Sequence, residues 1–207
     1  MRIDTLVETY LKEQRGINFP IGEVARLVRA VIDTWKNMGR VFIFGNGGGA
    51  SIADHFASDL AVHPFVSDDK HKTINKERME VHCLNESMGL LTRLGNDLGY
   101  ENIFVDQLKN YSYLNEDDLV IAFSVSGNSP NILKALEYAS KEGVTTACIG
   151  KGGKAKDIVD ISVEIKGAST FPGQVGANEN YFHVEDLQGS IAHMITGLLK
   201  GVVNERT

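Results

Sequence analysis

Short apolar or alternating runs are separated along the chain by longer stretches of helical periodicity, and this order predicts strands and helices in turn. Apolar runs typical of buried strands lie at 41–44 and 119–123, and further strands are predicted at 80–84, 145–149 and 161–165. Helices are predicted near 3–15, 21–38, 51–61, 101–109, 130–142 and 180–203, with one more helical stretch before residue 95. This order predicts an α/β fold with three layers (α/β/α), in which helices cover both faces of a five-stranded parallel sheet.

Two of the predicted helices have well-defined apolar stripes. In the helix over 21–38 the stripe consists of Ile21, Val24, Leu27, Val28, Val31 and Trp35. In the closing helix it consists of Val184, Leu187, Ile191, Met194, Ile195 and Leu198. No internal repeat and no proline-rich linker divides the chain, so one domain is expected.

Charge and composition narrow the functional classes. The 207 residues carry a formal net charge of -6, which disfavours a nucleic-acid-binding protein and a surface for anionic lipid. No apolar run reaches the length of about 18 residues that a membrane span needs, and the start lacks the apolar stretch of a signal peptide. Cys83 and Cys148 lie in strand-like runs and are interpreted as buried thiols in a reducing compartment. We therefore expect a cytoplasmic protein that binds neither nucleic acid nor membrane.

A serine-rich loop follows the third predicted strand, with the sequence Ser124-Val125-Ser126-Gly127-Asn128-Ser129. Pro130 suits the first position of the next helix, with Ser129 as its cap. The hydroxyls and free backbone N–H groups favour an anion there, because a helix N-terminus carries partial positive charge. Since the loop contains no Lys or Arg, it suits a phosphate monoester held by neutral donors. An ordinary capped helix with spare serines would show the same pattern.

A glycine-rich loop follows the first predicted strand, with the sequence Gly45-Asn46-Gly47-Gly48-Gly49-Ala50. It formally matches the dinucleotide fingerprint G-x-G-x-x-A, which also needs an acidic residue about 20 residues later at the end of the next strand. The next strand ends at Leu84-Asn85, too far along, so a nicotinamide cofactor is disfavoured. Because both loops follow strands of a parallel sheet, we expect them to face one crevice at the carboxyl ends of the strands.

Four motifs, in this order, resemble the sugar isomerase (SIS) domain family, and within it the phosphoheptose isomerases. They are Gly45-Asn46-Gly47-Gly48, Asp54-His55-Phe56-Ala57, Gly95-Asn96-Asp97-Leu98-Gly99-Tyr100 and the serine-rich loop 124–129. The resemblance covers nearly the whole chain and implies a single SIS domain over 1–207, with a flavodoxin-like sheet and with 1–39 as a helical pair used in oligomer packing. It also implies a homotetramer with sites at subunit contacts, and a divalent metal, usually zinc (Zn²⁺).

The implied activity is an aldose–ketose isomerisation of sedoheptulose 7-phosphate to D-glycero-D-manno-heptose 7-phosphate, or of a close sugar phosphate, through an enediolate. By this resemblance, the substrate and its phosphate would be bound by Asn46, Gly47, Asn96, Asp97, Ser124, Ser126, Ser129 and Glu185. The catalytic pair would be Asp59 and His193, and the metal ligands would be His55, Asp59, Glu185 and His193. The family has Glu at the position of Asp59 and Gln at the position of Glu185.

The chemistry of these residues fits the implied reaction. Moving a proton between C1 and C2 of a sugar phosphate needs a base beside the carbon and an acid or a metal at the oxygens. His55 and Asp59 are four residues apart, so they lie on one face of a helix, and imidazole and carboxylate groups are suitable zinc ligands. Glu185 and His193 are about 12 Å apart along a helix axis and can share one metal only by reaching inward from either end. Taken alone, the first pair would be a surface contact and His193 an interface histidine.

Two other functions compete with an isomerase. A non-catalytic relative of the same fold could bind sugar phosphates and regulate a partner such as a replication initiator protein, but such relatives lack the catalytic histidine that His193 supplies here. A regulatory sugar-phosphate sensor would carry a fused DNA-binding domain, for which 207 residues leave no room.

Overall fold

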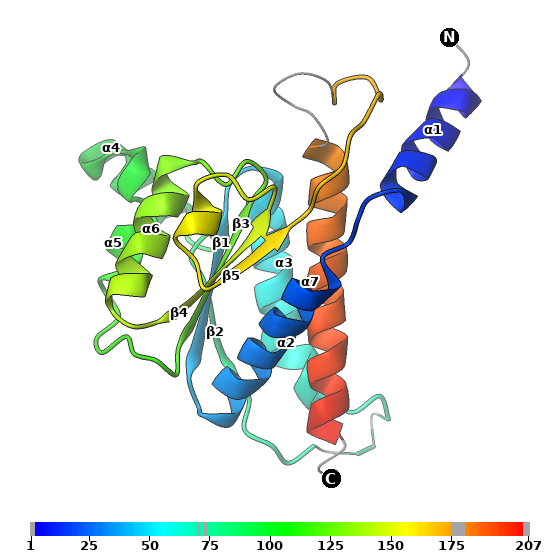
Figure 1. Ribbon diagram of the computed structural model, residues 1–207. Coiled ribbons are helices and arrows are strands. Elements are labelled where there is room, and N and C mark those ends of the chain that lie inside the picture. Colours follow the sequence, from blue (N-terminus) through cyan, green and yellow to red (C-terminus); the bar gives the residue numbers. More distant parts are fainter. Residues whose placement is uncertain (1–2, 70, 73, 175–180, 205–207) are drawn as a thin grey trace.

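A five-stranded parallel sheet forms the centre of the protein, as the sequence predicts (Figure 1). The computed structural model describes residues 3–69, 71–72, 74–174 and 181–204. The sheet has the order β2-β1-β3-β4-β5, and each neighbouring pair is parallel. Its strands are β1 (Arg40–Gly45), β2 (Glu80–Cys83), β3 (Leu119–Ser124), β4 (Thr145–Gly150) and β5 (Ile161–Glu164).

Helices cover both faces of this sheet, and two separate hydrophobic clusters hold them there. On one face lie α2 (Ile21–Lys36), α3 (Gly48–Val62) and α7 (Tyr181–Asn204), and on the other lie α4 (Met88–Leu98), α5 (Val105–Leu108) and α6 (Pro130–Lys141), while α1 (Ile3–Arg15) contributes to neither cluster. Side chains alternate along β1, so that Val41 and Ile43 pack with α2, α3 and α7, while Phe42 and Phe44 pack with α5 and α6. This arrangement is the expected three-layer α/β/α fold, and burial on both faces explains why the strand is an unbroken apolar run.

Like α4, the first helix has no buried residue among those described. It stands apart from the sheet at one side of the molecule (Figure 1). Its last turns are attached to the body by Tyr10, which donates to Asp186 Oδ2 (2.5 Å), and by Glu13, which accepts from the backbone N–H of Thr170 (2.8 Å). In the described ranges, no helix combines the length and the apolar character that crossing a membrane requires.

Several element boundaries differ from those predicted. Helix α3 begins at Gly48 and not at residue 51, because Gly47 adopts a φ of 56° and turns the chain directly from the strand into the helix. The motif 95–100 was expected after a helix, but α4 runs through it as far as Leu98. Ile21 is exposed, although it was assigned to the apolar stripe of its helix.

The apolar stripe of the closing helix was also partly wrong. Val184, Ile191 and Ile195 are buried in the core, as predicted. Met194 and Leu198 are exposed, at 38% and 54% of their surface. In a helix of 24 residues, 3.6-residue periodicity alone does not fix where the buried face ends.

The order of the strands places a crevice between the ends of β1 and β3. The chain passes from β1 through α3 to β2 on one side, and from β3 through α6 to β4 on the other. Because α3 and α6 belong to different hydrophobic clusters, they cover opposite faces of the sheet. Such a reversal opens a crevice at the carboxyl ends of the strands, and ligands bind there in open α/β sheets. The glycine-rich and serine-rich loops both begin at this point.

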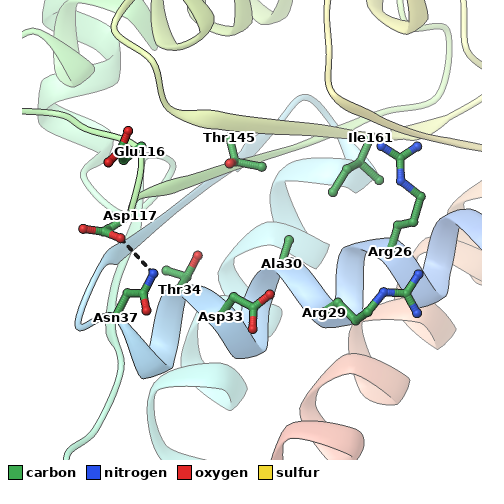
Figure 2. Close-up of a pocket in the computed structure, with 10 residues that line it drawn as sticks. All are labelled: Arg26, Arg29, Ala30, Asp33, Thr34, Asn37, Glu116, Asp117, Thr145 and Ile161. Atoms are coloured by element: carbon green, nitrogen blue, oxygen red, sulfur yellow. Dashed lines mark hydrogen bonds between the residues drawn. The ribbon is translucent and has the colours of Figure 1, made fainter.

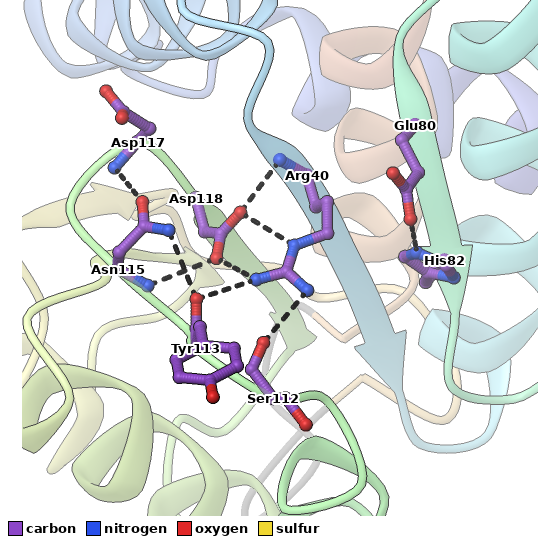
Figure 3. A network of polar contacts seen from close by, with 8 residues as sticks. All are labelled: Arg40, Glu80, His82, Ser112, Tyr113, Asn115, Asp117 and Asp118. Carbon is purple, nitrogen blue, oxygen red and sulfur yellow. Dashed lines mark hydrogen bonds and ion pairs between the residues drawn. The ribbon is translucent and has the colours of Figure 1, made fainter.

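A buried ion pair joins the same two strands at their other ends (Figure 3). Asp118, which is 1% exposed, accepts hydrogen bonds from the backbone N–H (2.9 Å), Nε (3.0 Å) and Nη2 (2.7 Å) of Arg40. It also accepts from the backbone N–H of Asn115 at 3.2 Å. The hydrogen bond to Asp118 raises the pKa of the Arg40 guanidinium further above its ordinary value. This pair fixes the start of β3 beside the start of β1.

Candidate functional site

The serine-rich loop forms a tight turn between β3 and α6. Ser124 is buried, and its Oγ accepts from the backbone N–H of Gly127 at 3.2 Å. Gly127 has a φ of 64°, and a Cβ atom there would lie 1.9 Å from the carbonyl oxygen of Gly152, so the turn requires glycine. Ser126 Oγ accepts from the backbone N–H of Asn128 at 3.2 Å. Ser124 and Ser126 therefore shape the turn itself.

Ser129 occupies the N-cap position of α6, but its side chain makes no capping hydrogen bond. The prediction that its hydroxyl caps the helix is therefore wrong. With a ψ of 126° at Ser129 and proline at the next position, the chain enters the helix without that bond. The helix is 12 residues long, so its N-terminus carries partial positive charge at the crevice, although the N–H groups of Ile132 and Leu133 already donate to Asn131 Oδ1 and to the carbonyl oxygen of Ser129. This geometry supports the predicted anion site, and the phosphate roles of the three serines stay predictions.

Asn46 is held by two other side chains at the crevice. Its Nδ2 donates to Asn131 Oδ1 (2.9 Å), and its Oδ1 accepts from Asn131 Nδ2 (2.8 Å) and from the hydroxyl of Tyr100 (3.1 Å). Asn46, Gly47 and Tyr100 line a cavity of about 340 Å³ between the glycine-rich loop and α4. Asn46 and Gly47 therefore line a cavity at the crevice, and their role in binding the sugar stays a prediction.

Two asparagines that sequence reasoning missed support this arrangement. Asn85 accepts from the backbone N–H of Gly45 (2.9 Å) and donates to the carbonyl oxygen of Gly45 (3.0 Å). Asn131, in the first turn of α6, is 1% exposed. Asn85 closely follows the carboxyl end of β2, and this position was the signal that could have identified it, whereas Asn131 lies inside α6 and had no such local signal.

Asn96 and Asp97 lie near the C-terminal end of α4. Both are exposed, and Asn96 Nδ2 donates to Asp97 Oδ1 at 2.8 Å. Asp97 also lies 3.6 Å from Nε of Arg93, one turn earlier on the same helix. Neither residue lines the cavity beside Asn46. Their assignment to the sugar pocket stays a prediction.

Three of the four predicted metal ligands come together between α3 and α7. The Nε2 atoms of His55 and His193 are 3.0 Å apart, and His55 Nε2 lies 3.4 Å from Asp59 Oδ2. One potential ligand atom from each of the three side chains lies within 4.8 Å of the others. This is the one group of three or more metal-ligating side chains found in the described parts of the chain. Its donors, two imidazoles and a carboxylate, are those of an open, three-ligand zinc site.

Glu185, the fourth predicted ligand, does not join this group. A Cβ atom added to Gly48 would lie 2.6 Å from Glu185 Oε2, so the carboxylate packs against the first residue of α3. Burial, and then the charge of Asp186, raises the pKa of Glu185 above its ordinary value. The rise of a helix explains the separation, since eight residues place His193 about 12 Å farther along α7. The metal role of Glu185 stays a prediction.

Comparison with known proteins identifies the family. The model of the SIS domain matches residues 18–150 of the chain. The chain belongs to the SIS domain family. It is 34% identical to a phosphoheptose isomerase of Helicobacter pylori (strain P12) over 145 residues, which are 69% of this chain and 70% of that protein. It is 36% identical to a phosphoheptose isomerase of Trichlorobacter lovleyi over 149 residues, or 71% of each chain.

Solved structures agree on the SIS fold. A phosphoheptose isomerase from Neisseria gonorrhoeae has a TM-score of 0.73 at 17% identity, over 96% of this chain and 94% of that one. A phosphoheptose isomerase from Francisella tularensis has a TM-score of 0.71 at 23% identity, with the same coverage. At these identities the structural similarity establishes the fold, and the family assignment rests on the sequence matches.

A second cavity of the SIS domain, of about 350 Å³, lies at the opposite edge of the sheet (Figure 2). Its lining includes Thr145 and Ile161, the first residues of β4 and β5, and side chains of α2. Arg26 in this lining already has partners, Glu23 Oε2 at 2.8 Å and the carbonyl oxygen of Asp160 at 2.9 Å. Because it lies at the beginnings of the strands, this cavity is separate from the crevice at their carboxyl ends, where the two loops meet.

Proposed function

We propose that this protein converts sedoheptulose 7-phosphate to D-glycero-D-manno-heptose 7-phosphate, or isomerises a close sugar phosphate. It is a sugar-phosphate isomerase of the SIS domain family, as its curated relatives indicate. The observation that carries the proposal is the cluster of His55, Asp59 and His193, because it supplies bases and acids in a chain that also has the serine-rich loop. A non-catalytic binding protein is not favoured, since its site would need no such cluster.

The residues of the cluster suit the two proton transfers of an isomerisation. In our proposal Asp59 and His193 form the acid–base pair, one removing the proton from carbon while the other donates to oxygen. His55 lies between them, at 3.4 Å from the carboxylate and 3.0 Å from the other imidazole, and so orients both. Ser124, Ser126 and Ser129 would hold the phosphate at the start of α6, and Asn46 and Gly47 would line the sugar side.

We further propose that the cluster binds Zn²⁺ through His55, Asp59 and His193. The two imidazoles and the carboxylate are donors of the right type, and three protein ligands leave a position open to a substrate oxygen. Bound zinc would polarise the carbonyl and alcohol oxygens of the sugar, which stabilises negative charge in the enediolate. Asp59 is one methylene shorter than the family's Glu, and it nevertheless reaches the imidazole of His55.

A homo-oligomer, which we propose to be a tetramer, would cover apolar surface that the single chain leaves exposed. Ile3, Val7 and Leu11 on α1 are 64%, 53% and 44% exposed, and with neighbouring side chains they line an apolar groove of about 430 Å³. Met194 and Leu198 on α7, close to His193 in the sequence, are also exposed apolar side chains. This surface supports a role of residues 1–39 in packing against another copy.

Replacement of His193 by alanine tests the proposed function. The variant should lose isomerisation by at least about 100-fold, because it removes one member of the acid–base pair. Turnover is measured with sedoheptulose 7-phosphate and a panel of ketose phosphates from C5 to C7, and binding of the same sugars by calorimetry. Binding should persist in the variant, because the serine-rich loop is intact.

The matched control is His71→Ala, which removes an exposed histidine of the loop after α3 and should leave turnover unchanged. If His193→Ala keeps full turnover, the assigned acid–base role is wrong. If the wild-type protein turns over none of the sugars in the panel, the proposed reaction itself is wrong.

A further inference from the structure

The side chains of Asn46 and Asn131 form a closed pair across the crevice. Each amide donates to the oxygen of the other, at 2.9 Å and 2.8 Å. Asn46 directly follows β1, in the loop that leads to α3, and Asn131 is the second residue of α6. The pair therefore joins the loop assigned to the sugar with the helix start assigned to the phosphate.

The acceptor capacity of both amide oxygens is fully used in this pair. Asn46 Oδ1 accepts from Asn131 and also from the Tyr100 hydroxyl, and Asn131 Oδ1 accepts from Asn46 and also from the backbone N–H of Ile132 (3.0 Å). An amide oxygen has two lone pairs, so neither oxygen has one left for a ligand. Asn46 can then offer a substrate only its second Nδ2–H. This limits its role in the sugar pocket to that of a hydrogen-bond donor.

Asn131 is too deeply buried to be a contact residue. It is 1% exposed, whereas Asn46 is partly exposed and lines the cavity of about 340 Å³. A buried amide with its groups satisfied rigidifies the parts that it joins. Here the pair joins the glycine-rich loop to the start of α6. The pairing of β1 with β3 ends at Gly45 and Phe123, so the sheet does not hold these two segments together beyond that point.

We propose that Asn131 is a positioning residue, which fixes Asn46 and the glycine-rich loop relative to the phosphate-binding start of α6. This inference rests on the proposed isomerase function, since an isomerase must hold the reacting carbons at a set distance from the phosphate. Displacement of a substrate by about 1 Å can cost 100-fold in rate, so a loosened pair should lower turnover more than phosphate affinity.

The informative variant is Asn131→Ser. Serine near the start of a helix can still accept from a local backbone N–H, which preserves the helix start, but it is too short to reach Asn46. We expect kcat to fall by about 10- to 100-fold, with the Kd for inorganic phosphate and the thermal midpoint close to those of the wild type. In the Asn46→Ala background the same substitution should have no further effect on kcat, because its partner is already gone.

Two further variants keep the test decisive. Tyr100→Phe removes the third hydrogen bond of the group from a residue that is 62% exposed, so the fold should tolerate it. It should lower kcat in the same direction but by less, again with unchanged phosphate affinity. Asn37→Ala removes an exposed asparagine at the opposite edge of the sheet and should change neither quantity.

A folded Asn131→Ser protein with wild-type kcat would overturn the positioning role, as would equal losses of turnover and phosphate affinity. If Asn131→Ser does not fold, unchanged kcat in Tyr100→Phe overturns it instead. A wild-type protein without any isomerase activity would refute the proposed function and not this inference. In that case Asn131→Ser must weaken binding of a ketose phosphate but not of inorganic phosphate, and any other result rejects the pair as a positioning device.

Discussion

Replacing Asp118 by alanine removes the acceptor of four hydrogen bonds, three of them from Arg40, at a position where the side chain is 2% exposed. The loss of one partner from a buried ion pair costs about 3–5 kcal/mol, because the other charge is left without compensation. The Arg40 side chain is 19% exposed and keeps a hydrogen bond to the carbonyl oxygen of Tyr113 (3.1 Å). Water and that carbonyl reduce the penalty, so we expect a destabilisation near the lower bound, about 3 kcal/mol.

Urea denaturation measures this loss. With a slope of about 2 kcal/mol per molar urea, the midpoint should fall by about 1.5 M. Asp118→Asn should lie between the two proteins, because one oxygen remains for Arg40 while an NH₂ group faces the remaining donors. The matched control is Asp33→Ala, which removes an exposed i,i+3 partner of Lys36 at 3.7 Å and should change stability by less than about 0.5 kcal/mol. If Asp118→Ala were no less stable than this control, the assignment of β1–β3 stabilisation to the buried pair would be refuted.

Two further predictions concern Glu185 of α7, whose carboxylate packs against the start of α3, and the proposed metal ligands. Burial and the charge of Asp186 raise the pKa of Glu185, so ionisation of this carboxyl at a pH above its ordinary pKa of 4.5 destabilises the fold. Glu185→Gln should therefore be more stable than the wild type at pH 7. The denaturation curves of the two proteins should converge as the pH falls below 4.5, where the carboxyl is protonated in both the folded and the unfolded state. Zn²⁺ at about 100 times its Kd should stabilise the chelator-treated protein by about 2.7 kcal/mol in a thermal-shift assay, and His55→Ala should abolish this gain. Glu185→Gln should retain the gain, and its loss there would instead place Glu185 among the ligands.

The fold could be predicted from the sequence because its strands are short, apolar and bounded by glycine or polar residues. Val41 to Phe44 shows this best, since both faces of that strand are buried and every position must be apolar. The boundaries of the helices were harder to predict, and the start of α3 at Gly48 illustrates why. A run of glycines predicts a loop by composition, but here one glycine at positive φ redirects the chain and the next two begin the helix.

The site was predictable only in part. The spacing of residues in the sequence indicates which side chains share one face of a helix, but not which other element packs against that face. The spacing of His55 and Asp59 correctly placed both side chains on one face of α3. That His193 would meet them depends on the packing of α7 against α3, which no local pattern specifies. Asn131 was missed for the same reason, since a polar residue in a first helical turn is ordinary until its partner across the sheet is known.

The spacing of the residues on α3 and α7 explains how one site can extend over both helices. Gly48 and His55 are seven residues apart on α3, and their respective neighbours Glu185 and His193 are eight apart on α7. Seven residues are close to two full turns, so Gly48 and His55 lie on the same side of α3, about 11 Å apart. Eight residues go about 80° beyond two turns, so Glu185 and His193 lie on adjoining sides of α7, about 12 Å apart along its axis. One residue inserted in either helix would rotate the later contact by about 100° and separate His55 from His193. The contacts of α7 with Gly48 and His55 therefore fix the proposed acid–base cluster relative to the glycine-rich loop, and the Asn46–Asn131 pair joins that loop to the start of α6.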